Sequence, residues 1–311
     1  MTGLRVICLL VFGMTLVGFS SASRATHDIA DKSAKRIQFG LTAVVIRENL
    51  RFLDRWSHYL SEKVGQPVEF VRRKSYREVM DLLDTGQIDF AWICGYPYVK
   101  KRDPEFLNLM TVPVYSGKPL YHSFVIVHKD SPYQSIEDLQ GKVFAFSDPE
   151  SNSGFLFPQT LLARRGTTPE EHFRQTFFTY NHAETVEAVA EQVANGGAVD
   201  SYIWEYLNEH RPELTEKTRI IRKSPAFGFP PLVARIGVDP EIVQKMKAVL
   251  LGMADDPEGR EFLSGLELDR FGDFPPEIFD SIRKMVTETR RASPVSAAPM
   301  SADSKLLTVV K

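Results

Sequence analysis

Short apolar runs alternate with amphipathic segments from Arg36 onward, and this alternation predicts strands that alternate with helices. Helical spacing of apolar residues follows the first run and ends at Gly65, while Ser75 and Glu78 form a capping-box signature at the start of a second helix. Three of the runs have the length and composition of buried strands: residues 37–41, 68–71 and 88–94. This β-α-β-α-β order indicates a largely parallel sheet with helices on both faces.

A second unit of the same kind follows, and two segments are expected to cross between the units. Residues 121–128 form the first crossing strand, residues 219–236 return, and Asp239 with Pro240 begins a further helix. The sequence therefore predicts an α/β fold of two lobes with a ligand cleft between them. Lobe 1 comprises residues 36–121 and 219–288, and lobe 2 comprises residues 122–218. Within lobe 2, strands are expected at 143–146, 176–180 and 199–204, and helices at 155–165 and 183–194.

The two ends of the chain differ in character from this pattern. Arg5 precedes an apolar run at residues 6–19, and small residues follow it, which predicts a secretory signal peptide over residues 1–22, cleaved after Ala22. The alternative is a retained membrane anchor, for which the run is short. Residues 289–311 are rich in Ser, Ala and Pro, and we expect a disordered tail there.

Composition narrows the class of protein further. The chain has 311 residues, of which 43% are hydrophobic and 25% charged, and these values are typical of soluble globular proteins. Lys and Arg number 38 against 40 Asp and Glu, so no net positive field attracts nucleic acid or an anionic membrane. Cys8 lies in the signal peptide, which leaves Cys94 as a single thiol, and we expect it to be a buried, inert residue.

The segment between residues 146 and 158 is the most informative for chemistry. It follows a predicted strand and begins a helix, where backbone N–H groups and the positive end of the helix dipole favour an anion. Ser151, Asn152 and Ser153 add neutral side-chain donors, and Gly154 lacks a Cβ that would crowd the turn. Taken alone, the same residues also suit an ordinary helix N-cap in a loop.

A wider pattern favours the anion site. Residues 148–158 resemble the central motif of the PhnD-like family of phosphonate-binding periplasmic proteins, and the resemblance extends over about residues 36–286. The matching pattern reads Asp148-Pro149-x-Ser151-x-Ser153-Gly154-x-x-x-Pro158. The resemblance implies a two-lobe type II periplasmic binding protein that delivers phosphate, phosphite or a phosphonate to an ABC importer. It also implies a monomer that works in the periplasm with a membrane permease and ATPase, without a cofactor, a metal or enzymatic activity.

The resemblance also implies which residues bind the ligand. Ser151, Asn152 and Ser153, with Gly154 at the turn, match the helix start that grips the phosphonyl oxygens. His182 matches the family's ligand histidine, and its imidazole can donate to an anionic oxygen, with protonation adding charge. Two family tyrosines correspond to Tyr76 and Tyr121.

Two departures from the family pattern bear on the ligand. Asn152 stands where the family has Thr, and the return segment at 223–231 lacks the carboxylate that holds an ammonium group in aminoalkyl-phosphonate binders. Glu205 could supply one acid, and Phe227 or Phe229 could face the non-oxygen side of the ligand. We therefore expect phosphate, phosphite or a small alkyl phosphonate without an amino group.

Other functions have less support. Ser151, His182 and Asp148 could be assembled into a catalytic triad, although the G-x-S-x-G elbow of α/β hydrolases is missing. His122 and His128 lie roughly 20 Å apart on an extended strand, so they cannot share a metal ion. The alternative function is that of a sensory module of the same fold, which reports ligand occupancy to a separate membrane receptor.

Overall fold

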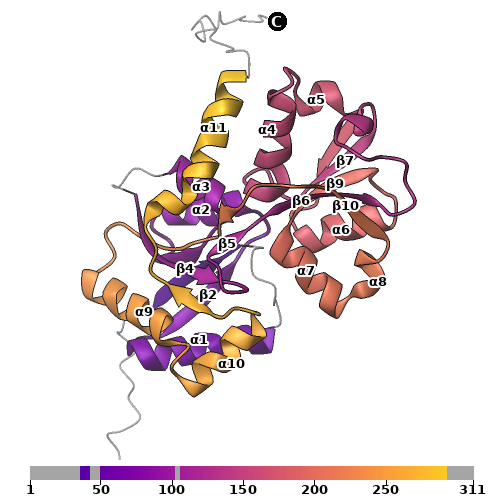
Figure 1. Cartoon of the computed structure of the whole chain (residues 1–311). Coiled ribbons are helices and arrows are strands. Elements are labelled where there is room, and N and C mark those ends of the chain that lie inside the picture. Colours follow the sequence, from indigo (N-terminus) through magenta and orange to yellow (C-terminus); the bar gives the residue numbers. More distant parts are fainter. Residues whose placement is uncertain (1–35, 43–49, 102–105, 293–311) are drawn as a thin grey trace, which may run out of the picture. The chain divides into compact units, whose positions relative to one another are not determined.

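The computed structural model describes residues 36–42, 50–101 and 106–292 (Figure 1). The predicted signal peptide at 1–22 lies outside the described residues, and so does the predicted tail from residue 293 onward. The beginning of that tail is corrected, because helix α11 (Asp280–Ala292) includes residues 289–292. Met285, Val286 and Thr289 are buried on one face of α11, so its buried face extends past the predicted boundary.

The first sheet has six strands and is mixed. Its order is β13-β4-β12-β3-β1-β2. Strand β1 pairs in parallel with β2 and β3, as the β-α-β-α-β pattern predicts, whereas β12 and β13 are antiparallel to their neighbours. The strands are β1 (Ile37–Leu41), β2 (Val68–Arg72), β3 (Phe90–Trp92), β4 (Leu107–Val114), β12 (Leu232–Arg235) and β13 (Arg270–Gly272).

The second sheet has five strands in the order β10-β6-β9-β7-β8. Strand β7 pairs in parallel with β8 and β9, and β6 is antiparallel to β9 and β10. A two-stranded sheet of β5 (Leu120–Tyr121) and β11 (Phe227–Gly228) joins the two connecting segments. The five strands are β6 (Ser123–His128), β7 (Val143–Phe146), β8 (Gln175–Phe178), β9 (Gly196–Asp200) and β10 (Thr218–Lys223).

Two parts of the second sheet differ from the sequence expectation. Residues 219–223 pair with β6, so the chain returns to the first sheet after Lys223, beyond the boundary expected at residue 219. Strand β9 ends at Asp200 instead of continuing to residue 204, because the Asp200 side chain accepts the Tyr202 N–H and begins helix α7 (Ser201–His210). An Asp at this position favours a helix start over a longer strand.

Helices cover both sheets. Figure 1 shows α4 on one side of the five-stranded sheet and α6, α7 and α8 on the other. Local signals explain several of the boundaries: Ser75 and Glu78 complete the predicted capping box of α2, and Asp239 caps α9 at the predicted Pro240. The remaining helices are α1 (Leu50–Val64), α2 (Tyr76–Asp84), α3 (Gly95–Lys100), α4 (Phe157–Ala163), α5 (Pro169–His172), α6 (His182–Ala190), α8 (Pro212–Thr215), α9 (Pro240–Gly252) and α10 (Pro257–Gly265). Within the described ranges, every helix is too short or too polar to span a bilayer.

Candidate ligand-binding site

The turn after β7 forms the centre of the candidate site. Ser151 precedes a π-helical turn, η2 (Asn152–Leu156), which continues into α4, and the Ser151 hydroxyl accepts the Gly154 N–H at 2.9 Å. A Cβ at Gly154 would lie 2.5 Å from the Ser147 Cβ, so only glycine fits. We call Ser151–Gly154 the anchor turn. The predicted N-cap is present, and it uses the Ser151 side chain itself.

Residues from other elements converge on the anchor turn. The Tyr121 hydroxyl on β5 accepts the Asn152 Nδ2–H at 2.9 Å, and the Cys94 Sγ before α3 accepts the Asn152 backbone N–H at 3.3 Å. Tyr76, the first residue of α2, places its hydroxyl 3.3 Å from the His182 Nε2. The seven residues that the sequence singled out thus fall into two groups, the anchor turn with Tyr121 and the pair of Tyr76 with His182, and each of the seven is buried. The Tyr76 N–H, which donates to Asp148 just before the anchor turn, links the two groups.

His182 is a neutral donor in this arrangement. It begins α6, and its Nδ1 accepts the Asp200 backbone N–H at 3.1 Å, so the proton of the neutral ring lies on Nε2 and faces Tyr76. Burial lowers the pKa of His182 to about 3. The ring is therefore uncharged at neutral pH, which differs from the charge-assisted donor expected from the sequence.

Two polar atoms of the anchor turn are buried without a hydrogen-bond partner of normal geometry: Asn152 Oδ1 and Ser153 Oγ. Buried polar side chains are nearly always paired, because an unpaired group loses its hydration and gains nothing in return. A half-turn of the Asn152 amide would let Tyr121 O–H donate to Oδ1 and would present the two Nδ2 hydrogens instead. With the amide in that orientation, the anchor turn has spare donors: the Ser153 hydroxyl and the Asn152 amide.

Two buried carboxyl groups flank the donors. The Asp148 carboxyl accepts the Tyr76 N–H at 3.1 Å and the Glu150 N–H at 2.7 Å, and burial raises its pKa to about 6. Asp200 accepts the Tyr202 N–H at 2.8 Å, and burial raises its pKa to about 8. The sequence pattern did not predict a pair of buried carboxyl groups here. The signal available for Asp200 was its position at the end of a strand, directly before a helix.

The other candidates from the sequence lie beside the anchor turn or away from it. Phe227 and Phe229 pack on the Tyr121 ring with centroids at 6.1 and 5.8 Å, and the Tyr115 hydroxyl donates to Glu205 at 2.9 Å. Cys94 is buried, and burial raises its pKa to about 12, which keeps the thiol protonated.

A catalytic triad is not assembled from the described residues. The Ser151 hydroxyl accepts the Gly154 N–H, the His182 ring contacts Tyr76 and the Asp200 backbone, and Asp148 accepts backbone N–H groups. The nucleophile, base and orienting acid are thus each engaged with a different partner.

The fold and this buried group of neutral donors define a class: a binding protein for a small polar ligand, with two α/β sheets joined by crossing segments. The sequence matches the family "ABC transporter, phosphonate, periplasmic substrate-binding protein" over residues 42–277. The chain belongs to that family. It is therefore a substrate-binding component of an ABC transporter for phosphonates or phosphate, and not an enzyme.

Individual relatives agree with this assignment. The phosphonates-binding periplasmic protein of Escherichia coli K12 is 24% identical over 256 residues, which cover 80% of this chain and 75% of the relative. The binding protein component of an ABC phosphonate transporter from Pseudomonas aeruginosa has a TM-score of 0.76 at 22% identity, with 83% of this chain and 88% of that chain covered. PhnD1 from Prochlorococcus marinus, solved with methylphosphonate, has a TM-score of 0.71 at 19% identity, with 83% and 99% covered. The fold is that of type II periplasmic binding proteins.

Proposed function

We propose that this protein captures a phosphate-type oxyanion in the periplasm and delivers it to the permease of an ABC importer. The ligand is phosphate, phosphite or a small alkyl phosphonate without an amino group. The observation that carries the proposal is the anchor turn, where the buried Ser153 hydroxyl and the Asn152 amide have hydrogen-bonding capacity left over. The periplasmic location rests on family membership and on the signal peptide predicted at residues 1–22.

Neutral donors suit such a ligand. A dehydrated oxyanion is stabilised when its oxygens accept several fixed N–H and O–H groups, and the Asn152 amide, Ser153 hydroxyl and His182 Nε2–H offer them. The Tyr76 hydroxyl lies 3.3 Å from His182 Nε2, and the Tyr121 hydroxyl orients the Asn152 amide. In this proposal the elements around 36–121 and 224–292 form one lobe, those around 122–223 form the other, and the monomer closes on the ligand.

The absence of an amino group in the ligand follows from how the nearby acids are used. Both Asp148 and Asp200 accept backbone N–H groups, and burial raises the pKa of each. Glu205 is hydrogen-bonded to Tyr115. Each acid that might hold an ammonium group thus already has a partner, which supports phosphate, phosphite or methylphosphonate over aminoethylphosphonate.

The test is titration calorimetry of the mature protein with phosphate, phosphite, methylphosphonate and aminoethylphosphonate. We expect tight binding of at least one of the first three. Ser153→Ala removes a buried hydroxyl that forms no hydrogen bond of normal geometry and interacts only weakly with the Tyr121 hydroxyl. Affinity should therefore fall about 5- to 30-fold, while the free energy of unfolding without ligand changes little.

Ser151→Ala is the matched control for that variant. Its hydroxyl caps the Gly154 N–H, so this substitution should lower the free energy of unfolding by about 1 kcal/mol even without ligand. No heat with any of the four compounds at millimolar concentration would contradict the proposed function. Tight binding of aminoethylphosphonate alone would contradict only the argument from the engaged acids.

A further inference from the structure

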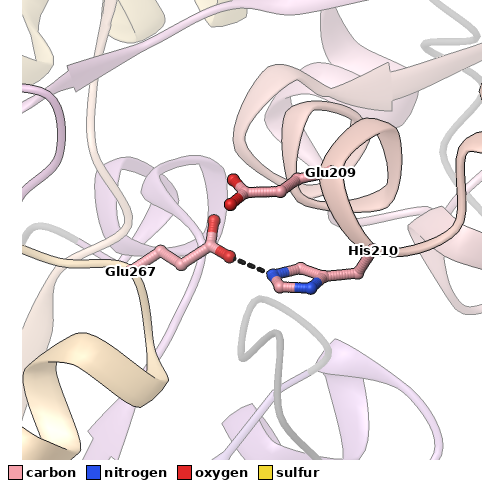
Figure 2. A group of neighbouring side chains, drawn as sticks. All are labelled: Glu209, His210 and Glu267. Atoms are coloured by element: carbon pink, nitrogen blue, oxygen red, sulfur yellow. Dashed lines mark hydrogen bonds and ion pairs between the residues drawn. The ribbon is translucent and has the colours of Figure 1, made fainter.

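Three metal-ligating side chains meet away from the anchor turn. Glu209 and His210 are the last two residues of α7, and Glu267 lies on the turn between α10 and β13. Figure 2 shows the two carboxylates and the imidazole pointing toward one another, and their ligand atoms all lie within 4.8 Å of one another. His210 and Glu267 are 57 positions apart in the chain, and their side chains are hydrogen-bonded through Nε2 and Oε1. We call these three residues the Glu-His-Glu cluster.

The charges of the Glu-His-Glu cluster are not balanced by basic side chains. Across the part of the chain that the structure describes, no Lys or Arg forms an ion pair with Glu209 or Glu267, and the neighbouring Arg211 pairs with Glu213 at 3.3 Å. The cluster also lies at the C-terminal end of α7, where the helix dipole is negative. Two carboxylates and a helix C-terminus together favour a bound cation.

The His210 ring is held in place by packing. The ring of Tyr206, one turn earlier on α7, lies with its centroid 4.3 Å from that of His210. The His210 and Glu267 side chains are 42% and 22% exposed, so an ion can reach them from solvent. A supported imidazole and two carboxylates on long side chains can close around an ion with small rotations.

We propose that the Glu-His-Glu cluster binds a divalent transition-metal ion of the Zn²⁺ type. One imidazole nitrogen and two carboxylate oxygens are ligands that Zn²⁺ prefers, and a water would complete a four-coordinate site. Mg²⁺ and Ca²⁺ are disfavoured, because they take oxygen ligands and this site includes nitrogen. The ion would join α7 to the turn that leads into β13, where the Tyr202 hydroxyl also donates to the Leu266 carbonyl.

The test is a calorimetric titration of the untagged mature protein with Zn²⁺, without any oxyanion present. We expect one ion per chain, and His210→Gln and Glu267→Gln should each weaken binding at least about 10-fold. His58→Gln is the matched control: His58 lies on the exposed face of α1 and pairs with Glu62, so this substitution should leave Zn²⁺ binding unchanged.

Thermal unfolding provides a second readout. Zn²⁺ should raise the unfolding temperature of the wild type and of His58→Gln, because an ion that binds only the folded state stabilises it, and it should not raise that of His210→Gln. The proposal is overturned if the wild type gives no heat at millimolar Zn²⁺, or if His210→Gln binds as tightly as the wild type. Glu209 and His210 lie in one proposed lobe and Glu267 in the other, so both measurements are repeated with saturating methylphosphonate to hold the lobes closed. Methylphosphonate heat without Zn²⁺ heat would contradict this proposal alone, and Zn²⁺ heat without heat from any of the four oxyanions would contradict the proposed function alone.

Discussion

Individual residues around the anchor turn owe their chemistry to burial. In water near neutral pH, Asp200 would be charged and His182 partly charged, yet burial moves the pKa of His182 down to about 3 and that of Asp200 up to about 8. The two shifts have the same result, since both groups are mainly uncharged near pH 7. A site made of neutral groups can take up an anion without first breaking strong internal ion pairs.

Asp200→Asn should change how stability depends on pH. Because the folded state holds the Asp200 proton more tightly than the unfolded state, its contribution to stability is complete below about pH 4 and is lost as pH rises to about 8. Asn is neutral throughout and keeps an oxygen for the Tyr202 N–H. The wild type should therefore lose stability relative to the variant over this range, by at most about 1.4 kcal/mol per pH unit.

Urea unfolding of both proteins at several pH values between 4 and 8 measures the difference. Asp54→Asn, at an exposed position of α1, is the control and should follow the wild type. Parallel curves for the wild type and Asp200→Asn would show that Asp200 is ionised in the folded state, contrary to the expectation.

At the scale of elements, the π-helical turn η2 decides the shape of the anchor. Ser147 lies beneath Gly154, and its hydroxyl bonds to the Ala198 carbonyl at 2.9 Å and to the Thr185 hydroxyl at 3.0 Å. Those bonds fix Ser147 against β9 and α6. The turn can therefore approach the sheet only where residue 154 has no side chain.

Gly154→Ala should consequently disturb both folding and binding. The new Cβ would lie 2.6 Å from the Ser147 hydroxyl, which cannot move without breaking its two hydrogen bonds. We expect a loss of about 1–3 kcal/mol in the free energy of unfolding, measured with urea, together with weaker oxyanion binding.

Gly252→Ala is the matched control. Gly252 ends α9, and a Cβ there would meet no atom within 4 Å. This second variant should be unchanged or more stable by about 0.5–1 kcal/mol, because alanine favours the helix. Equal effects of the two substitutions would contradict the steric argument.

At the scale of the whole described unit, several side-chain contacts join elements of the two sheets. Tyr76 contacts His182, Lys100 pairs with Glu150 at 3.1 Å, and Tyr115, which follows β4, donates to Glu205 on α7. The Tyr115 ring also packs on Phe229, which in turn packs on Tyr121 beside the anchor turn. If the proposed lobes separate without ligand, these contacts have to re-form each time they close.

Tyr115→Phe should therefore weaken ligand binding from a distance. The substitution keeps the ring contacts and removes one hydrogen bond to a carboxylate, so we expect about a 10-fold loss of affinity, seen mainly as faster ligand release. A double-mutant cycle with Glu205→Gln should be non-additive, because both changes remove the same bond. Unchanged release rates in stopped-flow measurements, or additive effects, would contradict the role of this contact in closure.

Elements whose sequence signals act over a few residues lie where the sequence predicts them, whereas elements that depend on distant partners do not. The capping box of α2, the Asp239 cap of α9 and strands β1 and β7 lie where the sequence predicted them. Two expectations are wrong: the sequence pattern places β10 in the return to the first sheet and extends β9 into α7. The error in β10 arises because the sheet that a strand joins depends on partners far away in the chain. Strand pairing of this kind leaves little trace in the residues of one strand.

The sequence by itself determined the order of strands and helices, the anchor turn between β7 and α4, and the family to which the chain belongs, because caps, glycine turns and helical spacing act over a few residues. Only the tertiary structure decided that the Ser151 hydroxyl caps the turn while the Ser153 hydroxyl forms no hydrogen bond of normal geometry, and that His182 is neutral. It alone also brought His210 to Glu267 across 57 positions. Hydrogen-bond partners, burial and the charge state they impose arise from contacts between distant segments, and no local pattern encodes them.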